Sequence, residues 1–148
     1  MILFIGHDAS LTGAPKSLLL IIAHISKNYN EPISIILKEG GPLEEEYRKL
    51  GKVFTWEKKW FYEKNIIKRL NNRLLNNNKR NQNKTLKYFN KNKPKVIFNN
   101  TVVNGVILEK LSKEIELKSV ICLQEVSNEW QGVLQLFFTQ TGYHFISQ

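Results

Sequence analysis

The stretch FIGHDASLTGAPKSLLL, residues 4–20, decides the fold class of this chain. It begins inside a continuous apolar run, ILFI (2–5), which is typical of a strand buried on both faces of a sheet. Pro15 then suits the first turn of a helix, because its missing N–H would be unpaired there in any case. The stretch predicts a strand, a polar loop and a helix. The loop is either an ordinary turn or the floor of a site for a negatively charged ligand.

The same alternation continues along the chain. Further apolar strands are expected at 33–37, 53–56, 95–98, 119–123 and 143–147. Helices are expected between Pro42 and Gly51, near 60–75, at about 102–115 and around 129–138. Unbroken apolar strands that alternate with helices predict an α/β fold, in which helices cover both faces of a parallel sheet. The length of 148 residues fits one such domain.

The net charge of +9 comes from one segment. Ten of the 22 basic residues lie in 64–93, which contains no acid, and the other 12 are balanced by 13 acidic residues. Within the asparagine-rich region 57–93, the stretch 76–84 (NNNKRNQNK) has almost nothing to bury, so we expect it to be mobile, with a helical turn near 86–89. We interpret 57–93 as a basic, helical or disordered insertion in the domain.

Composition excludes several classes of protein. The single cysteine, Cys122, cannot form an internal disulfide, and the first residues lack the basic start of a signal peptide. No apolar run approaches the roughly 20 residues that span a bilayer. We therefore expect a cytoplasmic protein.

Ligands of open parallel sheets bind at the carboxyl ends of the strands. In this sequence that rule selects four loops, at 6–14, 39–42, 99–101 and 124–129. The first holds a His-Asp pair, and the third holds two asparagines and a threonine.

Four stretches resemble, in this order, the amino-terminal half of glycosyltransferases of family 4: ILFIGHDASLTGAPKSLL, EGGPLEEEYRKLG, VIFNNTVVNG and SVICLQEV. The resemblance spans the chain except for 57–93. It implies a Rossmann-like domain that is one half of a two-domain, GT-B enzyme, which transfers a sugar from a nucleotide-sugar with retention of configuration, without a bound metal or other cofactor. This half would receive a saccharide or glycolipid acceptor. We expect the carboxy-terminal, donor-binding domain to be absent from this chain, and we expect these 148 residues to fold alone and to transfer no sugar.

In the family, the first loop is rich in glycine and approaches the donor diphosphate. Thr12, Gly13 and Ala14 match that loop, although the family often has two glycines where this chain has Thr12 and Gly13. Glycine lets the backbone come close to a phosphate, and a helix amino end offers unpaired N–H groups. The alternative is a turn glycine without a ligand.

The resemblance places Gln124 and Glu125 at the catalytic centre. Many family members have a histidine immediately before this glutamate. Glutamine can hydrogen-bond a sugar hydroxyl but cannot exchange a proton near neutral pH. Either this branch works without the imidazole, or its activity is weakened or lost. Glu125 is otherwise a cap at the start of a helix.

Acceptor-binding residues are expected at the strand ends. They are His7, Asp8, Gly40, Gly41, Asn99, Asn100 and Thr101. A lone His-Asp pair is most often an ordinary loop pair and makes a poor zinc site without a third ligand, so no metal is expected. The two glycines are favoured as a turn before a helix, and residues 99–101 also suit a helix cap.

A basic, apolar stretch suggests a peripheral membrane contact. Its residues are Trp60, Lys64, Lys68, Arg69 and Arg73, a composition typical of a helix on anionic lipid at the inner face of the membrane. The alternative is a surface helix packed on the domain. Two other functions stay open. One is a stand-alone carbohydrate- or nucleotide-binding module without catalysis. The weaker one is a nucleic-acid binder that stacks bases on Tyr88 and Phe89, and we expect no nucleic acid as partner.

Overall fold

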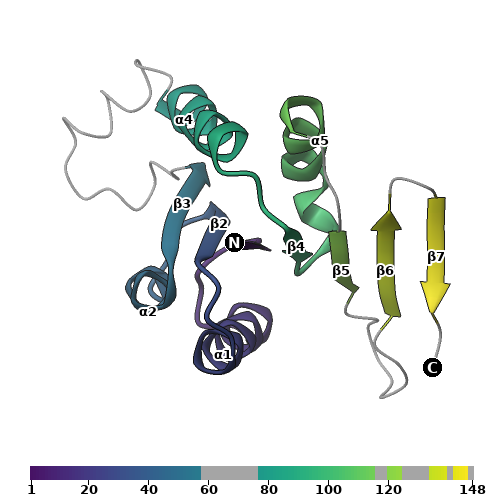
Figure 1. Ribbon diagram of the computed structural model, residues 1–148. Coiled ribbons are helices and arrows are strands. Elements are labelled where there is room, and N and C mark those ends of the chain that lie inside the picture. Colours follow the sequence, from purple (N-terminus) through teal and green to yellow (C-terminus); the bar gives the residue numbers. More distant parts are fainter. Residues whose placement is uncertain (58–76, 116–119, 125–133, 140–141, 147–148) are drawn as a thin grey trace.

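A computed structural model describes residues 1–57, 77–115, 120–124, 134–139 and 142–146. Its strands form one seven-stranded sheet with the order β3-β2-β1-β4-β5-β6-β7 (Figure 1). The strands are β1 (Ile2–Gly6), β2 (Ile33–Glu39), β3 (Lys52–Glu57), β4 (Val96–Asn99), β5 (Val120–Gln124), β6 (Leu134–Thr139) and β7 (Gly142–Ile146). The helices are α1 (Gly13–Asn28), α2 (Glu44–Leu50), α4 (Asn77–Lys91) and α5 (Gly105–Glu114), preceded by the short 3₁₀ helix η2 (Val102–Asn104).

The first five strands are parallel and confirm the predicted Rossmann-like α/β fold. The chain runs outward from β1 to β2 and β3, and then returns through α4 to β4 on the other side of β1. The order of the strands therefore reverses between β1 and β4. A crevice opens at such a point because the loops that follow the two strands turn away to opposite faces of the sheet.

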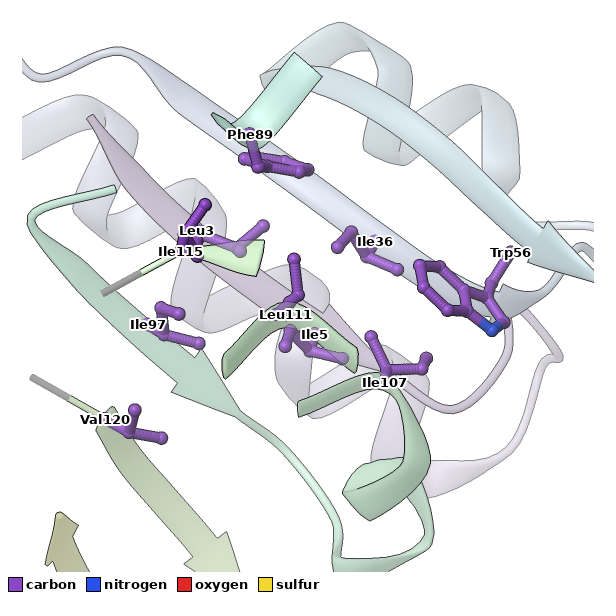
Figure 2. Packing of buried hydrophobic residues seen from close by; sticks show 10 residues of the cluster. All are labelled: Leu3, Ile5, Ile36, Trp56, Phe89, Ile97, Ile107, Leu111, Ile115 and Val120. Carbon is purple, nitrogen blue, oxygen red and sulfur yellow. The ribbon is translucent and has the colours of Figure 1, made fainter. Parts of the chain in front are cut away.

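Successive side chains of the central strands pack on opposite faces of the sheet, as the period of a strand requires. Phe4 of β1 faces the core under α1 and α2, together with Leu18 and Tyr47. Leu3 and Ile5 face the second core, which lies under α4 and α5 (Figure 2). The residues of this second core are Leu3, Ile5, Ile36, Trp56, Phe89, Ile97, Ile107, Leu111, Ile115 and Val120. The central strands of the sheet are thus covered on both faces, as their apolar sequences predict.

The expectation of a mobile stretch at 76–84 is wrong for residues 77–84, which form the first half of α4. The segment that follows them supplies the missing apolar contacts, because Thr85 and Phe89 are buried and Leu86 packs against the same core. Residues 77–91 therefore form the helix that links β3 to β4, as an integral part of the fold.

The end of the chain also differs from expectation. Residues 134–138, assigned to a helix around 129–138, belong to β6, which pairs antiparallel with β5 and β7. Its sequence, LQLFFT, combines leucine, phenylalanine and threonine, and aromatic and β-branched residues favour strands. The strand predicted at 143–147 is present as β7, but the sheet is parallel only as far as β5. Among the helices described, none is long and apolar enough to cross a membrane.

Candidate functional site

A cavity of about 120 Å³ opens at the reversal between β1 and β4, on the side of their carboxyl ends. Its walls come from the β1–α1 loop, the first turns of α1 and the segment after β4. The lining residues are Gly6, His7, Asp8, Thr12, Ala14, Pro15, Leu18, Asn100, Thr101 and Val103. The structure thus brings together six of the predicted site residues from segments about 90 positions apart: His7, Asp8, Thr12, Ala14, Asn100 and Thr101.

The β1–α1 loop is ordered by the carboxylate of Asp8. The backbone N–H and the hydroxyl of Ser10 both donate to Asp8 Oδ1, at 3.1 and 2.9 Å. The Ser10 hydroxyl lies 2.8 Å from Thr12 Oγ1, so the chain of hydrogen bonds reaches the start of α1. His7 Nδ1 lies 3.6 Å from the other oxygen of Asp8. The predicted His-Asp pair is therefore a contact within the wall of the cavity.

The start of α1 presents backbone N–H groups at the same place. Thr12 occupies the N-cap position, yet its side chain makes no capping hydrogen bond to the helix. Gly13 follows as the first helical residue. A Cβ built on it would meet no atom within 4 Å, and its backbone is not in the left-handed region. Neither packing nor backbone conformation therefore requires glycine at this position.

The other wall is built from amides. Asn99, which is 2% exposed, donates from Nδ2 to the carbonyl of Thr101 at 2.8 Å, and its Oδ1 accepts from Asn104 Nδ2 at 3.0 Å. Asn104 Nδ2 also donates to the carbonyl of Ile5 at 3.2 Å. Asn100 spans the crevice, with Nδ2 3.4 Å from the carbonyl of Ala14. These bonds fix the segment after β4 against the end of β1 and the start of α1.

Two buried oxygen atoms in this wall have no hydrogen-bond partner within the described part of the chain. They are Oγ1 of Thr101, which lines the cavity, and Oδ1 of the fully buried Asn104. Buried oxygen atoms usually accept a hydrogen bond, so Thr101 Oγ1 is suited to a donor such as a ligand hydroxyl, whereas Asn104 lies behind the lining residues. Asn104 was not predicted as a site residue, because an asparagine before a helix has the pattern of an ordinary cap.

The end of β2 and the loop that follows it form backbone hydrogen bonds with the β1–α1 loop. The N–H of Glu39 donates to the carbonyl of His7, and that of Leu43 to the carbonyl of Ala9, both at 2.9 Å. Gly41 lies so close that a Cβ on it would be 2.4 Å from the carbonyl oxygen of Ala9. Gly40 and Gly41 are not among the residues that line the cavity. Their predicted contact with an acceptor stays a prediction, while the structure gives Gly41 a role in positioning the loop.

Tyr47 of α2 forms a hydrogen bond with the first turn of α1. Its hydroxyl donates to the carbonyl of Pro15 at 2.6 Å, and its side chain is fully buried. Burial raises the pKa of this phenol well above its usual value, and the negative charge of Asp8 raises it further. Tyr47 therefore stays neutral and acts as a hydrogen-bond donor.

The cavity has polar walls. Its described lining residues offer a carboxylate, an imidazole, hydroxyls and an amide, and no lysine or arginine is among them. The carboxylate of Asp8 accepts hydrogen bonds from hydroxyl groups and repels anions. The positive end of α1 is the single feature of the lining that favours an anion. Among the described residues, no group of three or more His, Cys, Asp or Glu side chains is placed to hold a metal ion.

Several predicted site residues lie elsewhere. Gln124 is the last residue of β5, where its backbone pairs with Leu134. Glu125 lies outside the described residues, and so do the membrane-contact residues Trp60, Lys64, Lys68, Arg69 and Arg73. Their predicted roles stay predictions.

Comparison of the chain with models of known protein families, with curated proteins and with solved structures found no match.

Proposed function

We propose that this chain is the amino-terminal, acceptor-side domain of a retaining glycosyltransferase with the GT-B architecture, related to family 4. Two features support the proposal together. The motifs of the sequence follow the order of that family's first domain, and six of the residues matched to its site line one cavity at the reversal of the strand order.

The observation that carries the proposal is the composition of the cavity wall. A neutral sugar presents many hydroxyl groups, each of which both donates and accepts hydrogen bonds. Asp8 and Thr101 offer acceptors, and Asn100 offers an amide. A phosphate ligand would instead favour a lysine or arginine in the wall, and the described residues that line the cavity include neither. The cavity therefore suits a saccharide acceptor better than a nucleotide.

The size of the cavity fits half of a site. Sites that bury a whole drug-sized ligand start at roughly 300 Å³. About 120 Å³ accommodates one end of a sugar acceptor, with the start of α1 directed toward the diphosphate of a donor. In the proposed enzyme, a second domain grips the donor across the cleft. Because transfer requires the donor to be aligned with the acceptor, we expect this chain alone to bind a saccharide and to transfer nothing.

Asp8→Asn tests the proposal, because it keeps an oxygen that can accept from Ser10, removes the negative charge and replaces the second acceptor oxygen with an amide donor. Hydrogen bonds to a charged acceptor are stronger, so neutral saccharides should bind about fivefold more weakly to the variant. Pyrophosphate should bind more tightly, since the repulsion is gone. Calorimetric titration of both ligand classes measures the two changes.

Glu114→Gln provides the matched control, because this exposed glutamate at the end of α5 lies outside the lining of the cavity. It changes the net charge equally and should alter neither affinity. If no saccharide binds the wild type, or if both variants behave alike, the acceptor-site proposal is wrong. Steady sugar transfer by the chain alone would contradict the division of the site between two domains.

A further inference from the structure

Four cations of α4 lie in a row along the helix. Arg80, Lys84, Lys87 and Lys91 are spaced by four, three and four residues, so they share one face of the helix. All four are exposed. At 1.5 Å per residue they extend over about 16 Å. We call these four residues the basic stripe.

The orientation of the stripe is fixed by the opposite face of α4. Thr85 and Phe89 are buried there, and Phe89 points into the core between α4 and the sheet (Figure 2). The ring centroids of Tyr88 and Phe54 lie 4.8 Å apart. Lys52 Nζ lies over the Tyr88 ring, 3.9 Å from the centroid of that ring. The apolar face of α4 is thus occupied by the domain itself, and the stripe faces solvent.

No acid neutralises the stripe within the described part of the chain. The helix α4 contains no acidic residue, and none of the four cations makes an ion pair there. Other helices are different. On α2, Arg48 pairs with Glu44, and Lys49 lies 2.7 Å from Glu46. On α5, Lys113 lies 2.7 Å from Glu109. Of the other helices, α2 and α5 pair their cations with acids, and α1 carries only the two lysines Lys16 and Lys27, which lie 11 positions apart. The stripe is therefore the densest row of positive charge on the helices of the described chain.

We propose that the basic stripe of α4 docks the domain on an anionic phospholipid surface. Because the apolar face of α4 is packed on the core, the helix lies on the headgroups and does not insert between acyl chains. Docking then depends on charge alone, with each lysine or arginine near the surface strengthening binding about fivefold. The proposal concerns residues distinct from the cavity and stands without the proposed function.

A nucleic acid fits this surface less well. Single strands are held by exposed aromatic side chains on which bases stack, and Phe89 is buried while Tyr88 packs under Lys52. The packing of these two rings therefore disfavours the alternative in which bases stack on them. A duplex groove would have to admit the helix, but α5 lies beside α4, with Lys110 Nζ 2.8 Å from Gln82 Oε1. A flat anionic surface needs neither aromatic groups nor a free helix.

The test is co-sedimentation of the whole chain with phosphatidylcholine vesicles, with and without phosphatidylglycerol. The wild type should bind only the anionic vesicles and should be released by salt, which screens exposed charges beyond about 8 Å at physiological strength. The double variant Lys84→Gln, Lys87→Gln should bind about 30-fold more weakly. The matched control Lys16→Gln, Lys27→Gln removes two exposed charges of α1 and should bind like the wild type.

Circular dichroism of both variants checks that the fold is intact. Equal losses in the two variants would overturn the proposal, because net charge and not the stripe would then decide binding. Undiminished binding of the stripe variant would overturn it as well. A random duplex oligonucleotide is tested in parallel, and stripe-dependent binding to the duplex without vesicle binding would assign the surface to nucleic acid instead.

Discussion

Gly13 occupies a position where a glycine has a thermodynamic cost and no structural reason. It is the first residue of α1, its Cβ direction is open, and its backbone is not left-handed. Glycine in a helix is less favourable than alanine by up to about 1 kcal/mol. The close approach of a ligand phosphate to the backbone would account for it, since a side chain would keep the phosphate away.

Gly13→Ala should therefore stabilise the protein and weaken ligand binding together. We expect the free energy of unfolding to rise by about 0.5 kcal/mol, because the helix start loses less conformational entropy. Gly105→Ala is the matched control, since Gly105 also begins a helix and also has open space around its Cβ. Urea unfolding should show a similar gain for both variants, and pyrophosphate titration should show a loss for Gly13→Ala alone. Equal pyrophosphate binding by both variants would show that Gly13 has no role in phosphate binding.

At this scale the sequence predicted residue types better than their partners. His7, Asp8, Asn100 and Thr101 could be chosen because they follow strand ends, where the fold places ligands. Asn104 and Tyr47 could not be chosen in this way. Their contacts with Ile5 and Pro15 join residues 99 and 32 positions apart, and no local pattern encodes such a pairing.

Among the elements, the connection from β2 to α2 sets the position of the site loop. It donates two backbone hydrogen bonds to the β1–α1 loop, at the carbonyls of His7 and Ala9. The same approach leaves no room for a side chain at Gly41. The predicted turn at EGGP therefore does more than reverse the chain. Its second glycine, Gly41, allows the loop after β2 to contact the loop after β1.

Gly41→Ala should therefore displace the β1–α1 loop. The new methyl group would be 2.4 Å from the backbone oxygen of Ala9, which cannot move without the loop. We expect a loss of about 1–3 kcal/mol in stability and weaker saccharide binding. Gly40→Ala is the control, because its Cβ would meet the flexible carboxylate of Glu44, which can turn aside. Thermal unfolding that ranks the two variants equally would contradict this positioning role.

Two elements, α4 and β6, differ from what their local sequence patterns predict. The start of α4 is almost entirely polar, and its helix is stabilised by burial of Thr85 and Phe89 farther along the chain. The strand β6 lies between β5 and β7, and pairing on both sides decides its conformation. In both cases tertiary contacts override the pattern within the segment.

For the whole molecule, the fold followed from the sequence because its central strands are continuous apolar runs. Leu3, Phe4 and Ile5 are all fully buried, which a strand covered on one face would not allow. The alternation of such strands with helices predicts a parallel sheet with helices on both faces. The antiparallel end of the sheet could not be predicted in the same way, because a short apolar strand pairs in either direction.

The two proposed sites lie on different parts of the molecule. The carboxyl edge of the sheet holds the cavity between β1 and β4, and the outer face of α4 holds the basic stripe. We propose that the first surface binds a saccharide and that the second orients the domain on an anionic surface. The two are separate in sequence and in charge, so substitutions in one should leave the other intact.

Backbone amide chemical shifts can show whether the cavity between β1 and β4 binds a saccharide. The isotope-labelled chain would be titrated with a panel of neutral oligosaccharides while its amide resonances are recorded. We expect concentration-dependent shifts confined to residues 7–14 and 100–104, with α4 unchanged. Shifts that gather elsewhere on the molecule, or none with any saccharide of the panel, would contradict it.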